Sequence, residues 1–182
     1  MKFCSLLLLL MLFSCSKEKP SQAIFKRLSA QETGIDFSND LTHDVATRSN
    51  LFDFDYFYNG AGVGVADLNN DGLLDLYFAG NQVEDKLYLN KGNFKFQDIS
   101  DHANLNLGLE GWSNGVSFVD INSDGFLDIY VSRGGPFGAD QRANLLYVNQ
   151  GDQTFIEQAE DFGSPYRRPP RLASPLPLPP PP

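Results

Sequence analysis

The globular part of this chain contains no cysteine, because its only two, Cys4 and Cys15, lie near the amino end. This excludes a disulfide framework and a cysteine-based metal site in that part. Long basic runs are also absent, and the 14 Lys and Arg are scattered among 23 Asp and Glu, for a formal net charge of -9. Nucleic-acid binding needs a basic surface, so no nucleic acid is expected as a partner. The acidic excess fits cation binding or simple solubility better.

No apolar run is long enough to cross a bilayer as a helix. The run Leu6–Phe13 follows a single Lys and ends just before Cys15, which predicts a signal peptide over residues 1–14. The stretch Leu12–Cys15 resembles the bacterial lipobox, although Phe13 stands where a small residue is more usual. The resemblance implies cleavage before Cys15 and lipidation of Cys15. An ordinary secretory signal with an incidental Cys is the alternative.

These features predict an exported lipoprotein with a short polar tether over residues 15–23. Its expected location is the bacterial cell envelope, anchored to the outer membrane and facing the periplasm or the cell surface. At the other end, residues 164–182 hold nine of the 11 prolines and predict an extended polyproline or disordered tail. This tail is either a Pro-rich ligand or wall-spanning linker, or an unrelated extension left by a frameshift or a truncated gene.

Between these ends, the main feature is an internal repeat. The loop 67–75, "DLNNDGLLD", recurs 53 positions later as the loop 120–128, "DINSDGFLD". In both units a strand with small residues precedes the loop, and a second strand and a hairpin follow it. The expected strands are Val63–Ala66, Leu74–Ala79, Val116–Val119 and Leu127–Ser132, and the expected hairpins span residues 87–96 and 146–156.

Each unit therefore predicts four short antiparallel strands and no convincing helix. That is the size of one β-propeller blade, so we expect an all-β fold with about two to two and a half blades over residues 24–163. The tyrosines Tyr88 and Tyr147 are 59 positions apart, which indicates a six-residue insertion within residues 132–142. Two blades cannot close a ring, so we expect a truncated member of its class, marginally stable and prone to associate through exposed sheet edges.

Two further segments carry weaker predictions. Phe52, Phe54, Tyr56 and Tyr58 alternate with other residues, which predicts a strand with one apolar face. Residues 23–50 could supply one or two strands of a preceding partial blade. Trp112 is expected to pack within a blade.

The chemistry of the repeated loop points to calcium. Both copies read D-x-N-x-D-G-x-x-D, in which alternate side chains can turn inward and the Gly permits a sharp turn. Calcium takes six to eight oxygen ligands, and such a loop can supply several of them. The predicted ligands are Asp67, Asn69, Asp71, Leu73 and Asp75 in the first loop, and Asp120, Asn122, Asp124, Phe126 and Asp128 in the second. Leu73 and Phe126 would contribute backbone carbonyls, and the position-nine carboxylates would bind directly or through a water.

The loop departs from an EF-hand because position 12 is Phe78 or Val131 instead of Glu, and because a strand follows it. Two structural calcium ions are expected, with dissociation constants of about 10⁻⁴–10⁻³ M, as in extracellular modules. Magnesium is disfavoured because it requires fewer protein ligands and stricter geometry. Ordinary polar turns of Asp, Asn and Gly are the alternative, but such turns do not require Asp twice at position nine.

This pattern of strand, acidic loop, strand and hairpin over residues 24–163 resembles the FG-GAP/VCBS repeats of integrin-alpha-like β-propellers. More closely, it looks like the bacterial VCBS-repeat lipoproteins related to cartilage acidic protein 1. The resemblance implies a propeller of about seven blades, often followed by an ASPIC/UnbV module. The other blades and that module are missing from this sequence. Some relatives carry an RNA-binding description, which the acidic charge of this chain does not support.

The expected function is a calcium-stabilised, membrane-anchored module whose loops face a protein or glycan partner, and not an enzyme. The alternatives are a fragment of a propeller-type carbohydrate-active enzyme and a dockerin-like calcium-loop module. His43 and His102 are isolated and are expected to be surface or hydrogen-bonded residues. Asp53 and Asp55 are expected to be strand-face acids instead of a catalytic pair. Arg133 and Arg142 are interpreted as surface charges that could contact a partner.

Overall fold

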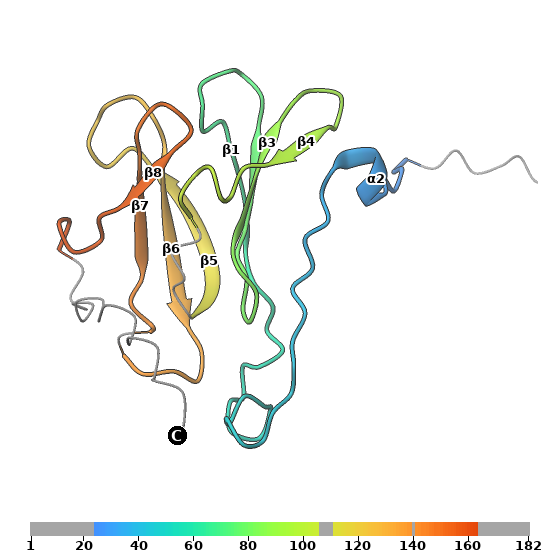
Figure 1. The fold of residues 1–182 in the computed structure, drawn as a ribbon, viewed down its shortest axis with the longest axis vertical. Helices are drawn as coiled ribbons and strands as arrows, with labels where there is room; N and C mark the ends of the chain where they lie inside the picture. Colours follow the sequence, from blue (N-terminus) through green and yellow to red (C-terminus); the bar gives the residue numbers. More distant parts are fainter. Residues whose placement is uncertain (1–23, 106–110, 140, 164–182) are drawn as a thin grey trace, which may run out of the picture.

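Two four-stranded antiparallel sheets make up the fold and lie side by side in Figure 1. The computed structural model describes residues 24–105, 111–139 and 141–163. The first sheet contains β1 (Val63–Ala66), β2 (Asp75–Phe78), β3 (Lys86–Asn90) and β4 (Phe96–Asp98). The second sheet contains β5 (Trp112–Val119), β6 (Asp128–Gly134), β7 (Leu145–Asn149) and β8 (Phe155–Glu157). The predicted all-β class is confirmed, while the predicted signal peptide, tether, lipidation site and tail lie outside the described residues.

Every strand pairs with its neighbour in the sequence, so each sheet is a simple meander. The hairpin between β3 and β4 turns through Gly92, Asn93 and Phe94, which all have positive φ angles. Phe94 therefore lies in the turn of the predicted hairpin, and β4 begins at Phe96. The six extra residues of the second unit lengthen β6 and its connection to β7.

The main core lies between the two sheets. There β1 approaches β5 so closely that a Cβ atom on Gly64 would lie 2.6 Å from the ring of Phe118. Buried side chains of both sheets fill the remaining space, among them Tyr77, Leu87, Leu89, Ile129, Val131, Leu145 and Tyr147. Because each sheet buries one face in this shared core, the two sheets stabilise each other.

The segment before β1 does not form the predicted partial blade. It contains a short helix, α2 (Ala30–Thr33), that Ser29 caps by accepting a hydrogen bond from the Glu32 N–H. Residues 24–62 form no strand, and their β pairing consists of one isolated antiparallel bridge between Asp44 and Ser49. The chain then runs along the outer side of the first sheet, where the rings of Phe37 and Phe78 stack with centroids 5.0 Å apart. A single extended segment thus takes the place that further strands were expected to fill.

The aromatic stretch 51–58 was predicted as a strand, and this prediction is wrong. The Asn50 side chain accepts hydrogen bonds from the N–H groups of Phe52 and Asp53, and the Phe54 N–H bonds to the Asn50 carbonyl. Asn thereby offers the backbone a local alternative to sheet pairing. Consecutive turns result, with Phe57 fully buried and Phe52 exposed, opposite to the predicted face.

Trp112 is buried at the start of β5, as expected of a packing residue. Its ring lies 5.5 Å from that of Phe54 and 5.6 Å from that of Phe57, measured between centroids. Trp112 therefore joins the second sheet to the turn segment 51–58, and the aromatic residues of that segment serve this junction.

Candidate metal-binding loops

The two acidic loops emerge at the same end of the molecule, after β1 and after β5 (Figure 1). They contact each other directly, because the Asn70 side-chain amide donates a hydrogen bond of 3.0 Å to the Gly125 carbonyl. The repeat has therefore placed its two most acidic segments next to each other.

In the first loop the side chains turn inward and bind the loop's own backbone. Asp67 accepts hydrogen bonds from the N–H groups of Asp71 (3.1 Å) and Gly72 (2.8 Å). Asp71 accepts one from the Leu73 N–H (2.8 Å) and one from the Asn69 side-chain amide (2.9 Å). Gly72 has a φ of 84°, so the sharp turn at position six uses the freedom of glycine as predicted.

The second loop repeats these bonds one for one. Asp120 accepts hydrogen bonds from the N–H groups of Asp124 (3.1 Å) and Gly125 (3.0 Å). Asp124 accepts one from the Phe126 N–H (2.8 Å) and one from the Asn122 amide (2.7 Å). Because equal spacing has produced equal geometry, whatever one loop can bind the other loop can bind as well.

The position-nine carboxylates have a role that spacing alone did not reveal. Asp75 is fully buried, and its two oxygens accept hydrogen bonds from the N–H groups of Leu68 (3.0 Å) and Asn90 (2.9 Å). Asp128 is buried in the same way between the N–H groups of Ile121 and Asn149, both at 2.8 Å. These carboxylates fasten each loop to its hairpin, and each oxygen keeps a second lone pair for other use.

The charges within the first loop affect one another. Burial raises the pKa of the Asp75 carboxyl, and the charges of Asp71 and Asp67 raise it further, against the hydrogen bonds from Asn90 and Leu68. The loop therefore holds several carboxylates that repel each other at neutral pH. A bound cation would relieve this repulsion.

The donor set suits a hard cation, because it consists of carboxylate and amide oxygens with backbone carbonyls nearby. Within the described residues, however, no three His, Cys, Asp or Glu side chains gather as a preformed metal cage. The amide groups of Asn69 and Asn122 also turn their NH₂ ends toward Asp71 and Asp124. The Asn69 and Asn122 oxygens accept hydrogen bonds from the N–H groups of Asp71 (3.2 Å) and Asp124 (3.1 Å). A cation bound through these oxygens would thus require the Asn side chains to reorient, while the backbone of each loop is already folded.

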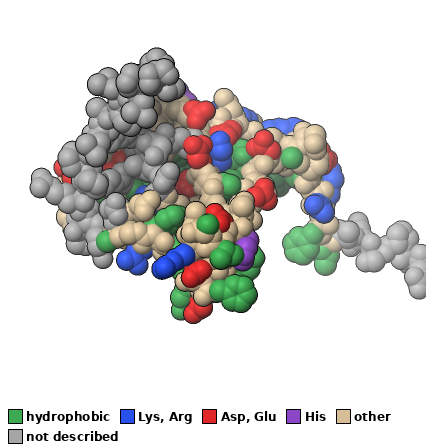
Figure 2. Space-filling view, turned by 60° about the horizontal axis from the view of Figure 1, so that its bottom comes forward, with side chains coloured by type: hydrophobic (Ala, Val, Ile, Leu, Met, Phe, Trp, Pro, Cys, Tyr) green, Lys and Arg blue, Asp and Glu red, His purple; other side chains and the backbone are tan. Residues whose placement is uncertain are grey.

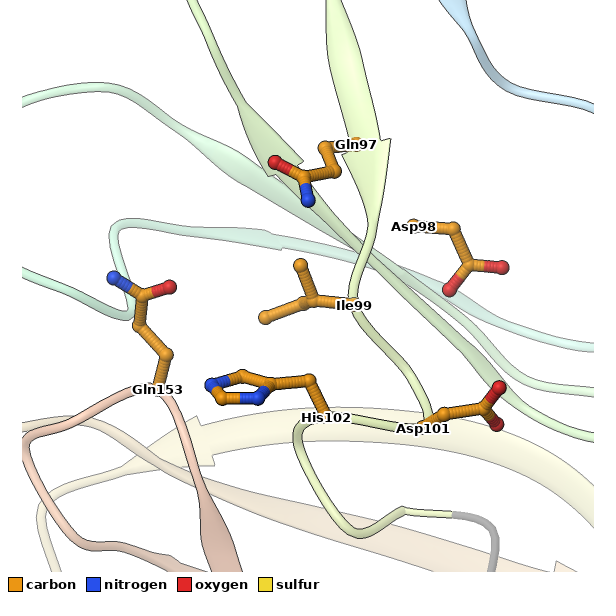
Figure 3. A pocket seen from close by; sticks show the side chains of 6 residues that line it. All are labelled: Gln97, Asp98, Ile99, Asp101, His102 and Gln153. Atoms are coloured by element: carbon orange, nitrogen blue, oxygen red, sulfur yellow. The ribbon is translucent and has the colours of Figure 1, made fainter.

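A polar pocket of about 590 Å³ lies where the end of β4 meets the β7–β8 hairpin. Figure 3 shows Gln97, His102 and Gln153 around Ile99, with the carboxylates of Asp98 and Asp101 pointing to the other side. Asp98 is already engaged, because it pairs with Lys86 at 3.1 Å and accepts hydrogen bonds from Ser100. His102, which the sequence left without a role, therefore lines a polar pocket.

Sequence reasoning missed a buried polar junction between the sheets. Asp85 accepts hydrogen bonds from the Tyr77 hydroxyl (2.6 Å), the Gly80 N–H (2.7 Å) and the Ser113 hydroxyl of the second sheet (3.0 Å). Arg133 is half-buried beside this junction and acts electrostatically on Asp85, so its interpretation as a surface charge is wrong. An acidic residue eight positions after a strand tyrosine carries no evident signal, so only the structure could reveal the junction.

The comparisons with known proteins agree with this architecture. Residues 67–131, which run from the first loop to β6, match the family described as FG-GAP-like repeat. The chain is also 28% identical over 152 residues to Integrin alpha-PS5 of Drosophila melanogaster. That alignment covers 78% of this chain but only 15% of the relative, so the chain spans a small part of the relative's length. Together with the two meander sheets, these matches support an FG-GAP/integrin-alpha-like repeat family and are consistent with an incomplete β-propeller of about two blades.

Proposed function

We propose that this chain is a calcium-binding interaction module in which calcium has a structural role. The observation that carries the proposal is the one-for-one repetition of the loop hydrogen bonds around carboxylates that repel each other. Acidic loops folded this closely are stabilised by a cation, which would supply charge neutralisation and no chemistry beyond that. FG-GAP-like repeats are in general not enzymes, and we propose no catalytic role for this chain.

The residues that would hold the ions follow from the two loops. The side chains of Asp67, Asn69, Asp71 and Asp75 and the carbonyl of Leu73 would hold one ion. The side chains of Asp120, Asn122, Asp124 and Asp128 and the carbonyl of Phe126 would hold the other. Asp75 and Asp128 would contribute only their second lone pairs, because both oxygens of each already bind backbone N–H groups.

Calorimetry in calcium and in EDTA tests this proposal. Calcium at about ten times its Kd should add about 1.4 kcal/mol per site to the free energy of unfolding, because it binds the native state alone. The double variant Asp71→Ala, Asp124→Ala should lose this gain, whereas Asp55→Ala, which removes one exposed carboxylate outside the loops, should keep it. An unchanged melting temperature of the wild type at millimolar calcium would overturn the proposal.

We also propose that Cys15 is lipidated and anchors the module to the bacterial cell envelope. The support is the sequence of residues 1–15. In the described ranges there is no helix of the length and apolarity that a membrane crossing needs. Mass spectrometry of the exported chain should show a diacylglyceryl group on Cys15, and Cys15→Ser should release the protein from membranes. An unmodified amino terminus at another residue would contradict the anchor.

The partner we propose is a protein or a glycan. The pocket lined by Gln97, His102 and Gln153 supports a polar ligand group, because amide and imidazole side chains can both donate and accept hydrogen bonds. On the face seen in Figure 2, Lys and Arg side chains lie scattered among acidic ones, which supports leaving nucleic acid out of the proposal. The dockerin-like alternative is not proposed, because both loops join strands and not helices.

A further inference from the structure

Asparagine or aspartate directly precedes glycine at four places in the sequence. These are Asn59–Gly60, Asp71–Gly72, Asn114–Gly115 and Asp124–Gly125. Such pairs are chemically labile, because a glycine has no Cβ atom to keep its backbone nitrogen away from the side-chain carbonyl carbon of the residue before it. The attack of this nitrogen requires a free glycine N–H, a side chain that can turn, and a main chain that can rotate.

In the two acidic loops the fold blocks this reaction by occupying the glycine N–H groups. Gly72 donates its N–H to Asp67 at 2.8 Å, and Gly125 donates its N–H to Asp120 at 3.0 Å. The aspartate before each glycine is held as well, because it accepts a hydrogen bond from the N–H of the residue after the glycine. The labile pairs of both loops are therefore protected.

The pair Asn114–Gly115 is protected in another way, because it lies within β5. The residues on both sides of Asn114 pair with β6, which fixes the main chain. The first sheet also approaches closely, since a Cβ atom on Gly62 would lie 2.9 Å from the Cα atom of Gly115. The Asn114 side chain packs on β6, where its amide nitrogen would lie 2.5 Å from a Cβ atom on Gly134.

The pair Asn59–Gly60 meets all three requirements. It follows the turn segment 51–58, at the end of the molecule away from the acidic loops (Figure 1). Both residues are exposed and belong to no strand. Among the residues that the structure describes, neither the Asn59 side chain nor the Gly60 N–H has a hydrogen-bond partner.

The surroundings of this pair leave room for the attack. Apart from its chain neighbours, no described atom would lie within 4 Å of a Cβ atom on Gly60. The Asn59 N–H donates to the Tyr56 carbonyl at 3.1 Å, so the turn holds the backbone on the amino side of the pair. On the other side, Gly60 has a φ of 77° and can adopt either sign of φ, so the peptide between the two residues can rotate.

We propose that Asn59 is a site of spontaneous modification, at which the chain itself converts asparagine to aspartate and isoaspartate. The Gly60 backbone nitrogen loses its proton and forms a bond to the Cγ atom of Asn59. The bond from Cγ to the side-chain nitrogen breaks, and ammonia leaves. Water then opens the resulting five-membered imide at one of its two carbonyls, which gives either aspartate or isoaspartate. No atom is oxidised or reduced in these steps.

The product differs from the original chain in charge and in backbone length. Its new carboxylate adds to those of Asp53 and Asp55 in the preceding turn segment. Isoaspartate also lengthens the main chain by one carbon, between the buried contact of Phe57 with Trp112 and the start of β1. The class of enzyme that would act on this product is a methyltransferase specific for isoaspartyl carboxylates.

Incubation of the folded, full-length chain tests the proposal, in a mild detergent that shields the apolar run Leu6–Phe13. A mildly alkaline buffer favours loss of the proton from the attacking nitrogen. The ammonia released is measured, and a purified isoaspartyl methyltransferase reports isoaspartate through methyl incorporation. Mass spectrometry of peptides locates the site. The peptide that contains Asn59 should gain the mass by which a carboxyl exceeds a carboxamide.

The pair in β5 is the internal control for the effect of the fold. In the folded chain Asn59 should react at least about tenfold faster than Asn114, because Asn114 must first be released from β5 and an opening free energy of about 1.4 kcal/mol already gives this factor. In denaturant the two residues should react at similar rates, since glycine follows both. The protection of Asn114 would then belong to the fold and not to the local sequence.

Two matched variants assign the signal to its site. Asn59→Gln should lose the methyl incorporation, because the longer glutamine side chain would have to close a six-membered ring, which forms more slowly. Asn114→Gln should incorporate methyl groups like the wild type. Circular dichroism shows that each variant is folded, and the peptide masses of the wild type assign the site without any variant.

Three results would overturn the proposal. Equal rates at Asn59 and Asn114 in the folded chain would show that the exposed turn gives no advantage. Methyl incorporation that persists in Asn59→Gln would place the reaction elsewhere. An Asn59 peptide that changes in denaturant but not in the folded chain would show that the fold protects this pair as well.

Discussion

Tyr77 and Tyr130 occupy the same position in the two sheets, yet the first is 0% exposed and the second 39%. Their hydroxyls bond to residues that also correspond in the repeat, Tyr77 to Asp85 and Tyr130 to Asn144, both at 2.6 Å. The local arrangement is therefore the same in both sheets. The difference arises because the second sheet covers Tyr77, whereas among the described residues no further sheet covers Tyr130. The repeat thus determines the local geometry, and the neighbouring sheet determines the burial.

The consequence for electrostatics is large at Asp85. Burial raises the pKa of the Asp85 carboxyl, although hydrogen bonds from Tyr77, Gly80 and Ser113 oppose this shift. The second sheet uses a neutral amide, Asn144, at the equivalent place, where it accepts a hydrogen bond from the Arg133 N–H. A carboxylate thus occurs where a neighbouring sheet supplies a third donor, the Ser113 hydroxyl.

The largest effect is expected from Trp112→Ala, which removes a feature that only the second sheet has. In the first unit, the equivalent position is Asn59, which lies before β1. Trp112 is buried against Phe54 and Phe57, so truncation should lower the free energy of unfolding by about 3–5 kcal/mol. Urea denaturation measures this, with Phe52→Ala as the exposed control. A loss below about 1 kcal/mol would show that the turn segment 51–58 does not pack on β5.

Replacing each tyrosine by phenylalanine tests the comparison directly. Tyr77→Phe leaves the buried carboxylate of Asp85 without one donor, so it should lower the free energy of unfolding by about 1.5–3 kcal/mol. Tyr130→Phe, at a half-exposed position, should change it by less than about 0.5 kcal/mol. Equal losses in the two variants would refute the idea that the second sheet decides the importance of this position.

Asparagine to alanine changes isolate the hydrogen bond between the sheets. Both changes remove a bond to the sheet's own carbonyl (Leu127 or Leu74) and a bond from the hairpin glycine N–H, and Asn149→Ala alone also removes the bond to Leu68. The first variant should therefore be less stable than the second by about 0.5–1.5 kcal/mol, measured by chemical denaturation. If Asn90→Ala were the more damaging change, the bond between the sheets would contribute nothing.

The smallest effect concerns pH and Asp85→Asn, which installs the residue of the second sheet in the first. The raised pKa means that the native state binds a proton more tightly than the unfolded state does. Stability should therefore fall as the pH rises from the unfolded value of about 3.9 through the raised native value. The Asp85→Asn variant has no carboxyl at this position, so its free energy of unfolding should not show this fall. The difference between the variant and the wild type should therefore increase over that pH range and stay constant above it.

Thermal melts of both proteins between acidic and neutral pH measure the difference, which amounts to about 1.4 kcal/mol for each unit of pKa shift. Asp55→Asn, at an exposed position, should run parallel to the wild type. A relative stability that decreases with pH would show that Asp85 is stabilised in its charged form.

The sequence predicts the repeat, the loops and most strands, because small residues, loop Gly and hairpin Asn act over a few positions. The sequence wrongly predicts a strand at residues 51–58. The alternation of aromatic residues suggested a strand, but hydrogen bonds to the Asn50 side chain stabilise turns there. The sequence also could not reveal that Asp75 and Asp128 fasten loops to hairpins, or that Asp85 joins the sheets. Those contacts depend on which segments distant along the chain meet, and a single sequence does not state this.

The meander order of the strands also determines which sheet can form first during translation. Every pairing within the first sheet is between sequence neighbours, so β1 to β4 can form before β5 exists. The bond from Asn149 to Leu68 spans 81 residues, which take about 4–16 seconds to translate at about 5–20 residues per second. During that interval the side of the first sheet that bears Tyr77 and Leu87 faces water, and we expect the nascent chain to need chaperone protection there.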